Sequence, residues 1–376
     1  MNKNSLHTFL TIGIYALLAI LLFNSFFVFS FGKSLDAKID EAKELARPAK
    51  IEIIKLESSC SDCFDVDSVI EIIKKSNIEI VKEQSLPRNS KATQEIIDMY
   101  GIEKLPTVIL KGEINKPTIQ NFKKVDDALV FDAVSAPYED TKTNNVIGNV
   151  SSIIIGDKSC DVCIDFNLLI NNLKQNGVFI GNEEKLDFSE SAAKGLISNF
   201  VIEKLPAVLL SEDLDAYPEI AQSIKQSASQ KKGYYVLESQ APYVETPSGK
   251  LRGLANLTLI NDSSCSNCYD VKIHKSVLGR FGIAIGKENQ IDIKSTEGKQ
   301  LISRYNIKNV PTIVLTGDLE VYKNLNDVWK QVGTVETDGA YVFREIAAMG
   351  KGVVYKDVST NEIKGMEPAS EIGQQQ

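Results

Sequence analysis

The chain is poor in the residue types that most often carry enzyme chemistry or a structural framework. Its 376 residues contain two histidines and six cysteines, and no cysteine lies outside a C-x-x-C pair. The sequence therefore predicts no framework of structural disulfides, which a chain of this length does not need. It also has no glycine-rich phosphate loop and no paired-carboxylate motif. These absences leave the C-x-x-C pairs as the main candidate chemistry.

Positive charge is also in short supply. The chain has 42 lysines and arginines against 50 acidic residues, a formal net charge of −8. Because contacts to phosphate need a basic surface, this balance argues against a nucleic-acid partner. A hydrophobic content of 43% and an aromatic content of 7% are ordinary for globular proteins. We therefore expect folded domains with no role in nucleic-acid binding.

The cysteine pairs recur at a fixed distance from a later proline. In each repeat, the proline follows the first cysteine by 46 residues and has an aliphatic residue before it. The pairs are Cys60/Cys63, Cys160/Cys163 and Cys265/Cys268, and the dipeptides are Leu105-Pro106, Leu205-Pro206 and Val310-Pro311. The second pair begins 100 residues after the first, and the third begins 105 after the second. The sequence therefore predicts three tandem modules, each large enough to bury its own core.

A long uncharged run lies near the N-terminus. Phe9 to Gly32 spans 24 residues without a charge, and a helix of that length reaches about 36 Å, enough to cross a membrane. We interpret it as an uncleaved single-pass anchor. The alternative is a cleaved signal peptide, whose apolar core is usually shorter, about 7–15 residues. Positive charges on the C-terminal side favour a cytoplasmic location, but long domains often translocate regardless, and we expect the modules outside the cytoplasm.

The predicted organisation has six parts. They are a tail and transmembrane anchor at 1–32, a stalk helix at 33–48, three similar domains at 49–145, 146–250 and 251–366, and a disordered tail at 367–376. Each domain reads as strand, helix, strand, helix, strand, so the class is α/β and crossovers between parallel strands are expected. Plausible N-caps for the second helices are Ser90, Ser189 and Ser295. A further helix, clearest at 325–332, completes each domain, and the segment near the closing tyrosine is either a terminal hairpin or a short linker.

The placement of the cysteines predicts reactive thiols. The first cysteine is expected between a strand end and a helix start, where unpaired N–H groups and the helix dipole favour the thiolate. The second lies three residues on, within disulfide reach, and supplies a resolving thiol. A cis peptide bond at the later proline would turn a backbone edge toward the cysteines, and a peptide could pair with that edge.

This pattern resembles the thioredoxin superfamily, including disulfide isomerases and periplasmic dithiol oxidoreductases. The resemblance covers about residues 50–365, in three copies. It implies a thioredoxin fold, with nucleophilic Cys60, Cys160 and Cys265. It also implies that Cys63, Cys163 and Cys268 are resolving cysteines and that Pro106, Pro206 and Pro311 are cis. Thiols or disulfides of client proteins are the implied partners, with a redox partner protein possible and no cofactor.

The sequence departs from the family pattern beside each pair. Serine replaces the usual tryptophan before the first cysteine, and the family's buried acid is replaced by Ile54, Ile154 and Leu259. An acid recurs three residues before each first cysteine, at Glu57, Asp157 and Asp262. It could accept the proton of the resolving cysteine, or it could close the turn or cap the helix. Asp62 and Asp161 lie between cysteines, whereas Asn267 is neutral, so the third module is expected to be the most oxidising.

Two simpler interpretations compete with redox chemistry. Zinc would need two cysteine pairs about 15–20 residues apart, whereas these are about 100 apart, so we predict no metal site. His274 is expected to be a surface residue. The predicted function is a membrane-anchored thiol–disulfide oxidoreductase acting on protein cysteines. The alternative is a non-catalytic thioredoxin-fold binding or scaffold protein at the membrane.

Overall fold

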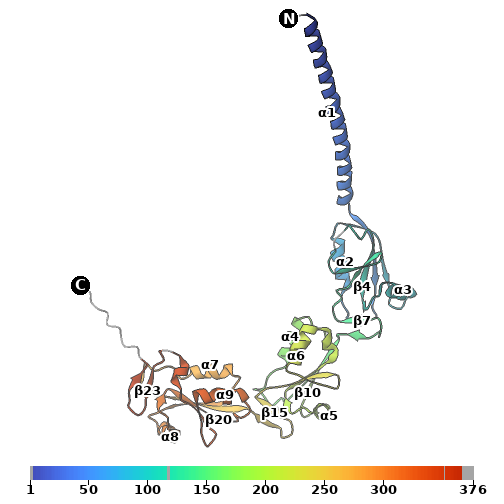
Figure 1. Cartoon of the computed structure of the whole chain (residues 1–376). Helices are drawn as coiled ribbons and strands as arrows, with labels where there is room; N and C mark the ends of the chain where they lie inside the picture. The colour runs from blue at the N-terminus through green and yellow to red at the C-terminus, as the bar shows by residue number, and fades with distance from the viewer. Residues whose placement is uncertain (1–2, 117–118, 351, 366–376) are drawn as a thin grey trace, which may run out of the picture. The chain divides into compact units, whose positions relative to one another are not determined.

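The computed structural model describes residues 3–116, 119–350 and 352–365. The predicted disordered tail at 367–376 lies outside these residues. The chain divides into two compact units, Met1–Ile147 and Gly148–Gln376. The first unit holds an N-terminal helix and the first module, and the second unit holds the other two modules (Figure 1).

The N-terminal helix α1 (Lys3–Ala46) is continuous over 44 residues. The predicted anchor and stalk are thus one helix, which stops just before Arg47 because Pro48 disfavours helical backbone in the residue that precedes it. By length and composition, the segment Gly13–Glu44 could cross a membrane, because it contains an 18-residue window with a mean hydropathy of 2.2. A signal sequence near the N-terminus has the same length and hydropathy, so these two properties do not distinguish it from an anchor.

The first module is built on a five-stranded sheet in the order β2-β1-β4-β6-β5. Its elements are β1 (Ala49–Leu56), α2 (Val66–Lys74), β2 (Ile78–Leu86), α3 (Lys91–Tyr100), β4 (Thr107–Gly112), β5 (Phe122–Val125) and β6 (Ala128–Phe131). Strands β1 and β2 are parallel, as predicted, but β4 runs antiparallel to β1. The antiparallel register pairs Leu56 with Thr107. It therefore brings the start of β4, and the proline before it, to the end of β1 from which the cysteine loop leaves.

The second module repeats this sheet in the order β10-β9-β12-β14-β13. Its elements are β9 (Val150–Gly156), α4 (Asn167–Gln175), β10 (Ile180–Asp187), α5 (Ser191–Phe200), β12 (Ala207–Ser211), η1 (Glu212–Ala216), α6 (Pro218–Lys225), β13 (Ser229–Lys231) and β14 (Tyr234–Glu238). Here Ile155 at the end of β9 pairs with Ala207 at the start of β12. The same strand ends therefore meet as in the first module.

The third module has the sheet order β18-β17-β20-β22-β21. Its elements are β17 (Leu254–Asn261), α7 (Ile273–Arg280), β18 (Ala284–Asp292), α8 (Thr296–Arg304), β20 (Thr312–Gly317), α9 (Lys323–Val332), β21 (Gly333–Val335), β22 (Tyr341–Phe343) and η2 (Ile346–Met349). Helix α9 confirms the predicted third helix, and α6 is its counterpart in the second module. Among the described residues of the first module, no helix lies between β4 and β5.

Each central strand is buried on both faces, which explains the apolar runs at the start of each module. Successive side chains of a strand point to opposite faces. Accordingly, Ile53 of β1 packs with α2, whereas Leu56 packs with α3. In the third module, α7 and α9 cover one face of the sheet and α8 covers the other (Figure 1). Each module therefore has a complete two-sided core.

Every module ends in a hairpin, which is one of the two alternatives that the sequence left open. The hairpins are β7 (Tyr138–Asp140) with β8 (Val146–Ile147), β15 (Tyr243–Glu245) with β16 (Lys250–Arg252), and β23 (Tyr355–Asp357) with β24 (Ile363–Lys364). What the sequence did not indicate is their partner. Each hairpin adds to the two-residue strand that precedes the proline, namely β3 (Lys104–Leu105), β11 (Lys204–Leu205) and β19 (Asn309–Val310). The last segment of each module thus returns to the proline.

Two of the three predicted N-caps are confirmed. Ser90 and Ser295 accept hydrogen bonds from the backbone N–H groups of Thr93 and Gly298. The prediction for Ser189 is wrong, because α5 begins at Ser191 after Glu190. The hydroxyl of Ser189 instead donates to Asp187, a local turn bond that competes with capping.

Candidate thiol–disulfide site

All three C-x-x-C pairs form disulfides. The Cα atoms are 5.5 Å apart in Cys60–Cys63 and Cys160–Cys163 and 5.4 Å apart in Cys265–Cys268. Cys265 is buried at 8% exposure, whereas the first cysteines of the other modules are half-buried. The three-residue spacing within a pair therefore gives the proximity that dithiol chemistry requires.

The disulfides do not lie at helix starts, so that part of the prediction is wrong. The first helices begin at Val66, Asn167 and Ile273, several residues after each pair. The delay comes from an aspartate five residues after the first cysteine, since its carboxylate accepts the N–H two residues further on and nucleates the helix there. These aspartates are Asp65, Asp165 and Asp270. Because the dipole acts mainly within the first turn, it does not account for reactivity at the cysteines.

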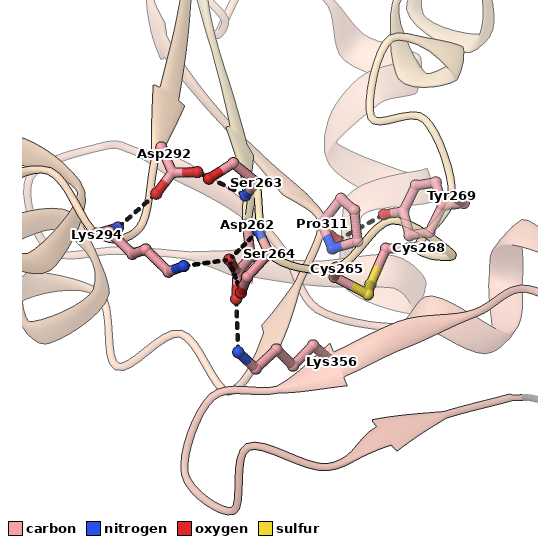
Figure 2. Close-up of a disulfide and its surroundings, with 10 residues drawn as sticks. All are labelled: Asp262, Ser263, Ser264, Cys265, Cys268, Tyr269, Asp292, Lys294, Pro311 and Lys356. Atoms are coloured by element: carbon pink, nitrogen blue, oxygen red, sulfur yellow. Dashed lines mark hydrogen bonds and ion pairs between the residues drawn. A yellow bond between two sulfur atoms is a disulfide. The ribbon is translucent and has the colours of Figure 1, made fainter.

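The three predicted prolines are preceded by cis peptide bonds, at Leu105-Pro106, Leu205-Pro206 and Val310-Pro311. In the second module, Pro206 lines the same hollow of about 400 Å³ as Cys160 and Cys163. In the third module, Pro311 lies beside the Cys265–Cys268 disulfide (Figure 2). In the second module, the proline and the sulfur pair thus face one space that is open to a ligand.

The residue before each proline has a buried side chain, so only its backbone is available to pair with a ligand. Leu105, Leu205 and Val310 have 0% exposure. In the described residues, each of β3, β11 and β19 is at the edge of its small sheet, with a strand on one side only. A peptide could pair with the open side, which is the mode of binding that the sequence predicts.

Two of the three upstream acids close the turn before the first cysteine. Asp157 accepts from the N–H of Ser159 at 2.8 Å and from its hydroxyl at 2.6 Å. Asp262 does the same with Ser264, at 2.9 and 2.6 Å. Glu57 differs, because its carboxylate accepts from Ser85 of β2 at 2.5 Å. Turn closure accounts for the aspartates, and a role as proton acceptor remains a prediction.

In the first module, Glu139 of the hairpin, and not Glu57, accepts the hydrogen bonds from the serines before Cys60. The carboxylate of Glu139 accepts from the N–H and hydroxyl of Ser59 at 2.9 and 2.8 Å and from the hydroxyl of Ser58 at 2.8 Å. It also pairs with Arg88 at 2.6 Å. Burial raises the pKa of Glu139, but the hydrogen bonds from Ser59, Arg88 and Ser58 outweigh it and leave that pKa below its usual value. A buried carboxylate therefore lies behind the loop that leads into Cys60.

In the third module, the hairpin contributes a base. The ammonium of Lys356 is 2.6 Å from the carboxylate of Asp262, whose side chain has 0% exposure (Figure 2). Lys294 is 3.9 Å from the same carboxylate. Burial raises the pKa of Asp262, but Lys356 and Ser264 outweigh it and lower the pKa to about 2. This ion pair lies beneath the loop that carries Cys265.

Sequence reasoning missed these hairpin residues, although a signal was present. Glu139, Val244 and Lys356 each directly follow the tyrosine that closes a module. Their distances from the prolines differ between modules, so a search for fixed spacing passes over them. The cis peptide bonds at Ala136-Pro137 and Ala241-Pro242, just before those tyrosines, were missed as well.

His274 contradicts the expectation of a surface residue, with 3% exposure. Its Nε2 is 2.9 Å from the hydroxyl of Tyr269, and that hydroxyl donates to the carbonyl of Pro311 at 2.6 Å. Burial lowers the pKa of His274 to about 4, so the ring is neutral near pH 7. Because Tyr269 follows Cys268, its hydrogen bond to Pro311 ties the disulfide loop to the proline (Figure 2).

The position of the family's buried acid is apolar and buried in all three modules. Ile54, Ile154 and Leu259 have exposures of 5%, 9% and 0%. The chain therefore lacks a proton acceptor at that place. In the part of the chain that the structure describes, no group of three histidine, cysteine, aspartate or glutamate side chains could hold a metal ion.

Comparison with known proteins gives structural neighbours only. Neither a protein-family model nor a curated protein matches the chain. The alkylhydroperoxide reductase protein AhpF of Enterococcus faecalis is 13% identical over 46% of this chain and 88% of that one, with a TM-score of 0.16. A protein disulfide oxidoreductase of Aeropyrum pernix is 16% identical over 45% and 77%, with a TM-score of 0.15. Human ERp44 is 10% identical over 73% and 80%, with a TM-score of 0.13.

At such TM-scores, the assignment rests on the features of the chain itself. These are the threefold sheet order, the three disulfides and the three cis-prolines. They define a protein of three tandem thioredoxin-like modules that follow an apolar N-terminal helix. Each module has a thioredoxin-like fold, and its cysteine pair supplies the two sulfur groups that thiol–disulfide exchange requires.

Proposed function

We propose that this protein is a membrane-anchored oxidoreductase that exchanges disulfides with the cysteines of client proteins. The observation that carries the proposal is the shared hollow of the second module. Its volume is about 400 Å³, and Cys160, Cys163 and Pro206 all line it. A client segment that paired with the open edge of β11 would place a sulfur beside Cys160.

The exchange needs only the two cysteines and the client. In the reducing direction, the thiolate of Cys160 attacks a client disulfide, forms a mixed disulfide and releases one client thiolate. The thiolate of Cys163 then attacks the Cys160 sulfur, re-forms the Cys160–Cys163 bond and releases the second client thiolate. Two electrons pass to the client, and the reverse sequence oxidises a client dithiol. The corresponding pairs of the other modules would react in the same way.

The N-terminal helix supports the anchoring part of the proposal. Its C-terminal end is joined to the first module by the ion pairs Arg47–Glu113, at 2.5 Å, and Lys116–Glu44, at 2.8 Å. A membrane helix so attached would hold the first module close to the bilayer. We place the modules outside the cytoplasm, and proteolysis of intact cells tests this, since modules that survive until the cells are lysed would contradict it.

Trapping of the mixed disulfide tests the proposed chemistry. In full-length protein, Cys163→Ser should accumulate a mixed disulfide with a disulfide-containing client such as insulin, because Cys160 attacks and nothing resolves the product. The matched variant Cys160→Ser should trap little. Non-reducing electrophoresis and mass spectrometry give the readout. Equal trapping by both variants, or none in any module, would favour the non-catalytic binding protein.

A further inference from the structure

One hairpin position faces the residue before the cis-proline in every module. The register pairs Leu105 with Glu139, Leu205 with Val244 and Val310 with Lys356. The position therefore carries an acid in the first module, an apolar residue in the second and a base in the third. Glu139 and Val244 each have 2% exposure, and the side chain of Lys356 has 14%. We call this place the hairpin position.

In the first module, the hairpin position is joined to the first cysteine by two hydrogen bonds. The hydroxyl of Ser58 donates to Glu139 at 2.8 Å and accepts from the backbone N–H of Cys60 at 3.0 Å. Arg88 binds Glu139 through its other oxygen. The loop that carries Cys60 also holds the acidic residues Glu57 and Asp62. Removing the charge of Glu139 therefore removes a negative charge that Ser58 links to Cys60, and it leaves the half-buried guanidinium of Arg88 without its carboxylate partner.

In the third module, the side chain at the hairpin position is a cation, Lys356, and it is connected to the first cysteine through Asp262. Lys356 binds the carboxylate of Asp262, and the backbone carbonyl of Asp262 accepts from the N–H of Cys265 at 3.0 Å. The remaining charges at this loop are Lys294 and Asp292 (Figure 2). Removing the charge of Lys356 would leave the buried Asp262 carboxylate without its closest cation, so the loop would become more negative.

In the second module, the hairpin position carries no charge. Val244 belongs to the apolar cluster against which Cys160 and Cys163 pack. The module thus provides an internal reference, because its fold and register match those of its neighbours while the charge is absent.

From these contacts we propose that the hairpin position sets the redox potential of each disulfide, with opposite signs in the first and third modules. A negative charge near a thiolate raises the thiol pKa and favours the disulfide, whereas a positive charge favours the dithiol. Glu139 makes Cys60–Cys63 more reducing, and Lys356 makes Cys265–Cys268 more oxidising. The biological use of this grading rests on the proposed function, but the potentials themselves do not require a client.

The test uses glutathione, with full-length protein in detergent. Each pair equilibrates by disulfide plus two glutathione thiols giving dithiol plus glutathione disulfide, and alkylation with mass spectrometry reports the three pairs separately. We expect Glu139→Gln to shift the Cys60–Cys63 equilibrium about tenfold toward the dithiol, or about +30 mV. Lys356→Gln should shift Cys265–Cys268 about tenfold toward the disulfide, or about −30 mV. Val244→Thr should change Cys160–Cys163 less than twofold.

Two further variants separate charge from structure. Lys356→Arg keeps the cation and should restore the parent potential, and Asp262→Asn should shift Cys265–Cys268 toward the dithiol. In each variant, hydrogen exchange of core amides in the altered module reports whether that module is folded, and the two unaltered modules are internal controls. Shifts of equal sign for Glu139→Gln and Lys356→Gln, or shifts below twofold in both, would overturn the inference. If the variants shifted the glutathione equilibria as expected but the protein did not exchange disulfides with insulin, only the proposed function would be contradicted.

Discussion

In the first module the residue after the closing tyrosine is Glu139, and in the third module it is Lys356. Both contact the loop that leads into the first cysteine, and both pair with an ion of opposite charge. The backbone around them is the same, with one sheet order, one cis-proline and one disulfide in each module. The two modules thus share the sheet order, the cis-proline and the disulfide, while a single position on the hairpin carries opposite charges.

The same two modules differ in the interior next to the second cysteine. In the first module Phe64 follows Cys63, and its N–H donates to the carbonyl of Pro137 at 2.8 Å. In the third module Tyr269 occupies this place, and its N–H donates to Val354 at 2.9 Å. Tyr269 also carries the hydroxyl that links His274 and Pro311. The third module thus holds a buried polar pair where the first has an apolar side chain.

Removal of the Lys356 cation should give the largest effect on stability. Lys356→Met leaves the buried Asp262 carboxylate without its main partner, and breaking a buried ion pair from one side costs about 3–5 kcal/mol. Hydrogen exchange of core amides in the third module of the full chain measures the loss. The double variant Lys356→Met/Asp262→Leu should recover most of it. A single variant as stable as the parent would mean that water already solvates Asp262.

The buried histidine makes the third module the acid-sensitive one. The pKa of His274 is lowered to about 4 in the folded protein, below its ordinary value of 6.5. The stability it confers is therefore full above pH 6.5 and is lost as the pH falls toward 4. The loss amounts to about 3 kcal/mol, because one pKa unit corresponds to about 1.4 kcal/mol.

Module-specific hydrogen exchange between pH 7 and pH 4 checks this expectation. His274→Leu should remove most of the dependence in that window, and the first module, with Val69 at the equivalent position, supplies the control. A chemical shift titration that placed the His274 pKa near 6.5 would contradict it. Asp262, whose pKa is lowered to about 2, contributes in a separate window below pH 4.

The tyrosine hydroxyl should matter less. Tyr269→Phe removes a hydrogen bond to the Pro311 carbonyl and leaves buried polar groups without their partner, at a cost of about 1–3 kcal/mol. Thermal unfolding followed by the third module's amide protection measures it. Phe64→Tyr in the first module is the reciprocal change, and we expect no gain there because Val69 supplies no polar partner for the hydroxyl in the place of His274. A gain in stability from Phe64→Tyr would show that the module supplies a partner from elsewhere.

We expect the smallest loss of stability from changes to the serine N-caps, which the first and third modules share. Ser90 and Ser295 cap α3 and α8 in the same way. Each change to alanine should cost about 1 kcal/mol, the usual value of a lost N-cap. Amide protection of the two helices gives the comparison, with the exposed Lys91→Ala as control. Costs that differ by more than a factor of two would show that the modules diverge in local structure as well as in charge.

Much of the fold could be predicted because its signals are local or evenly spaced. The prolines stand 46 residues after the first cysteines in each copy, and Ser90 precedes its helix directly. The errors arose where local groups compete. Asp65 draws the helix start past Cys63 by accepting an N–H two residues on. Ser189 bonds to Asp187 instead of capping. A single sequence does not show which of these competing hydrogen bonds forms, since each is locally favourable.

The sequence by itself determined the three modules, the pairing of the cysteines within each and the position of the prolines, since these follow from repetition and short spacing. Only the tertiary structure decided which charges surround the sulfurs. Glu139 and Lys356 reach the cysteine loops through a hairpin that pairs with the strand before the proline, and His274 becomes buried through packing against Phe343. Those contacts join residues that are far apart in the chain, so they form only when the core is folded and no local sequence pattern predicts them.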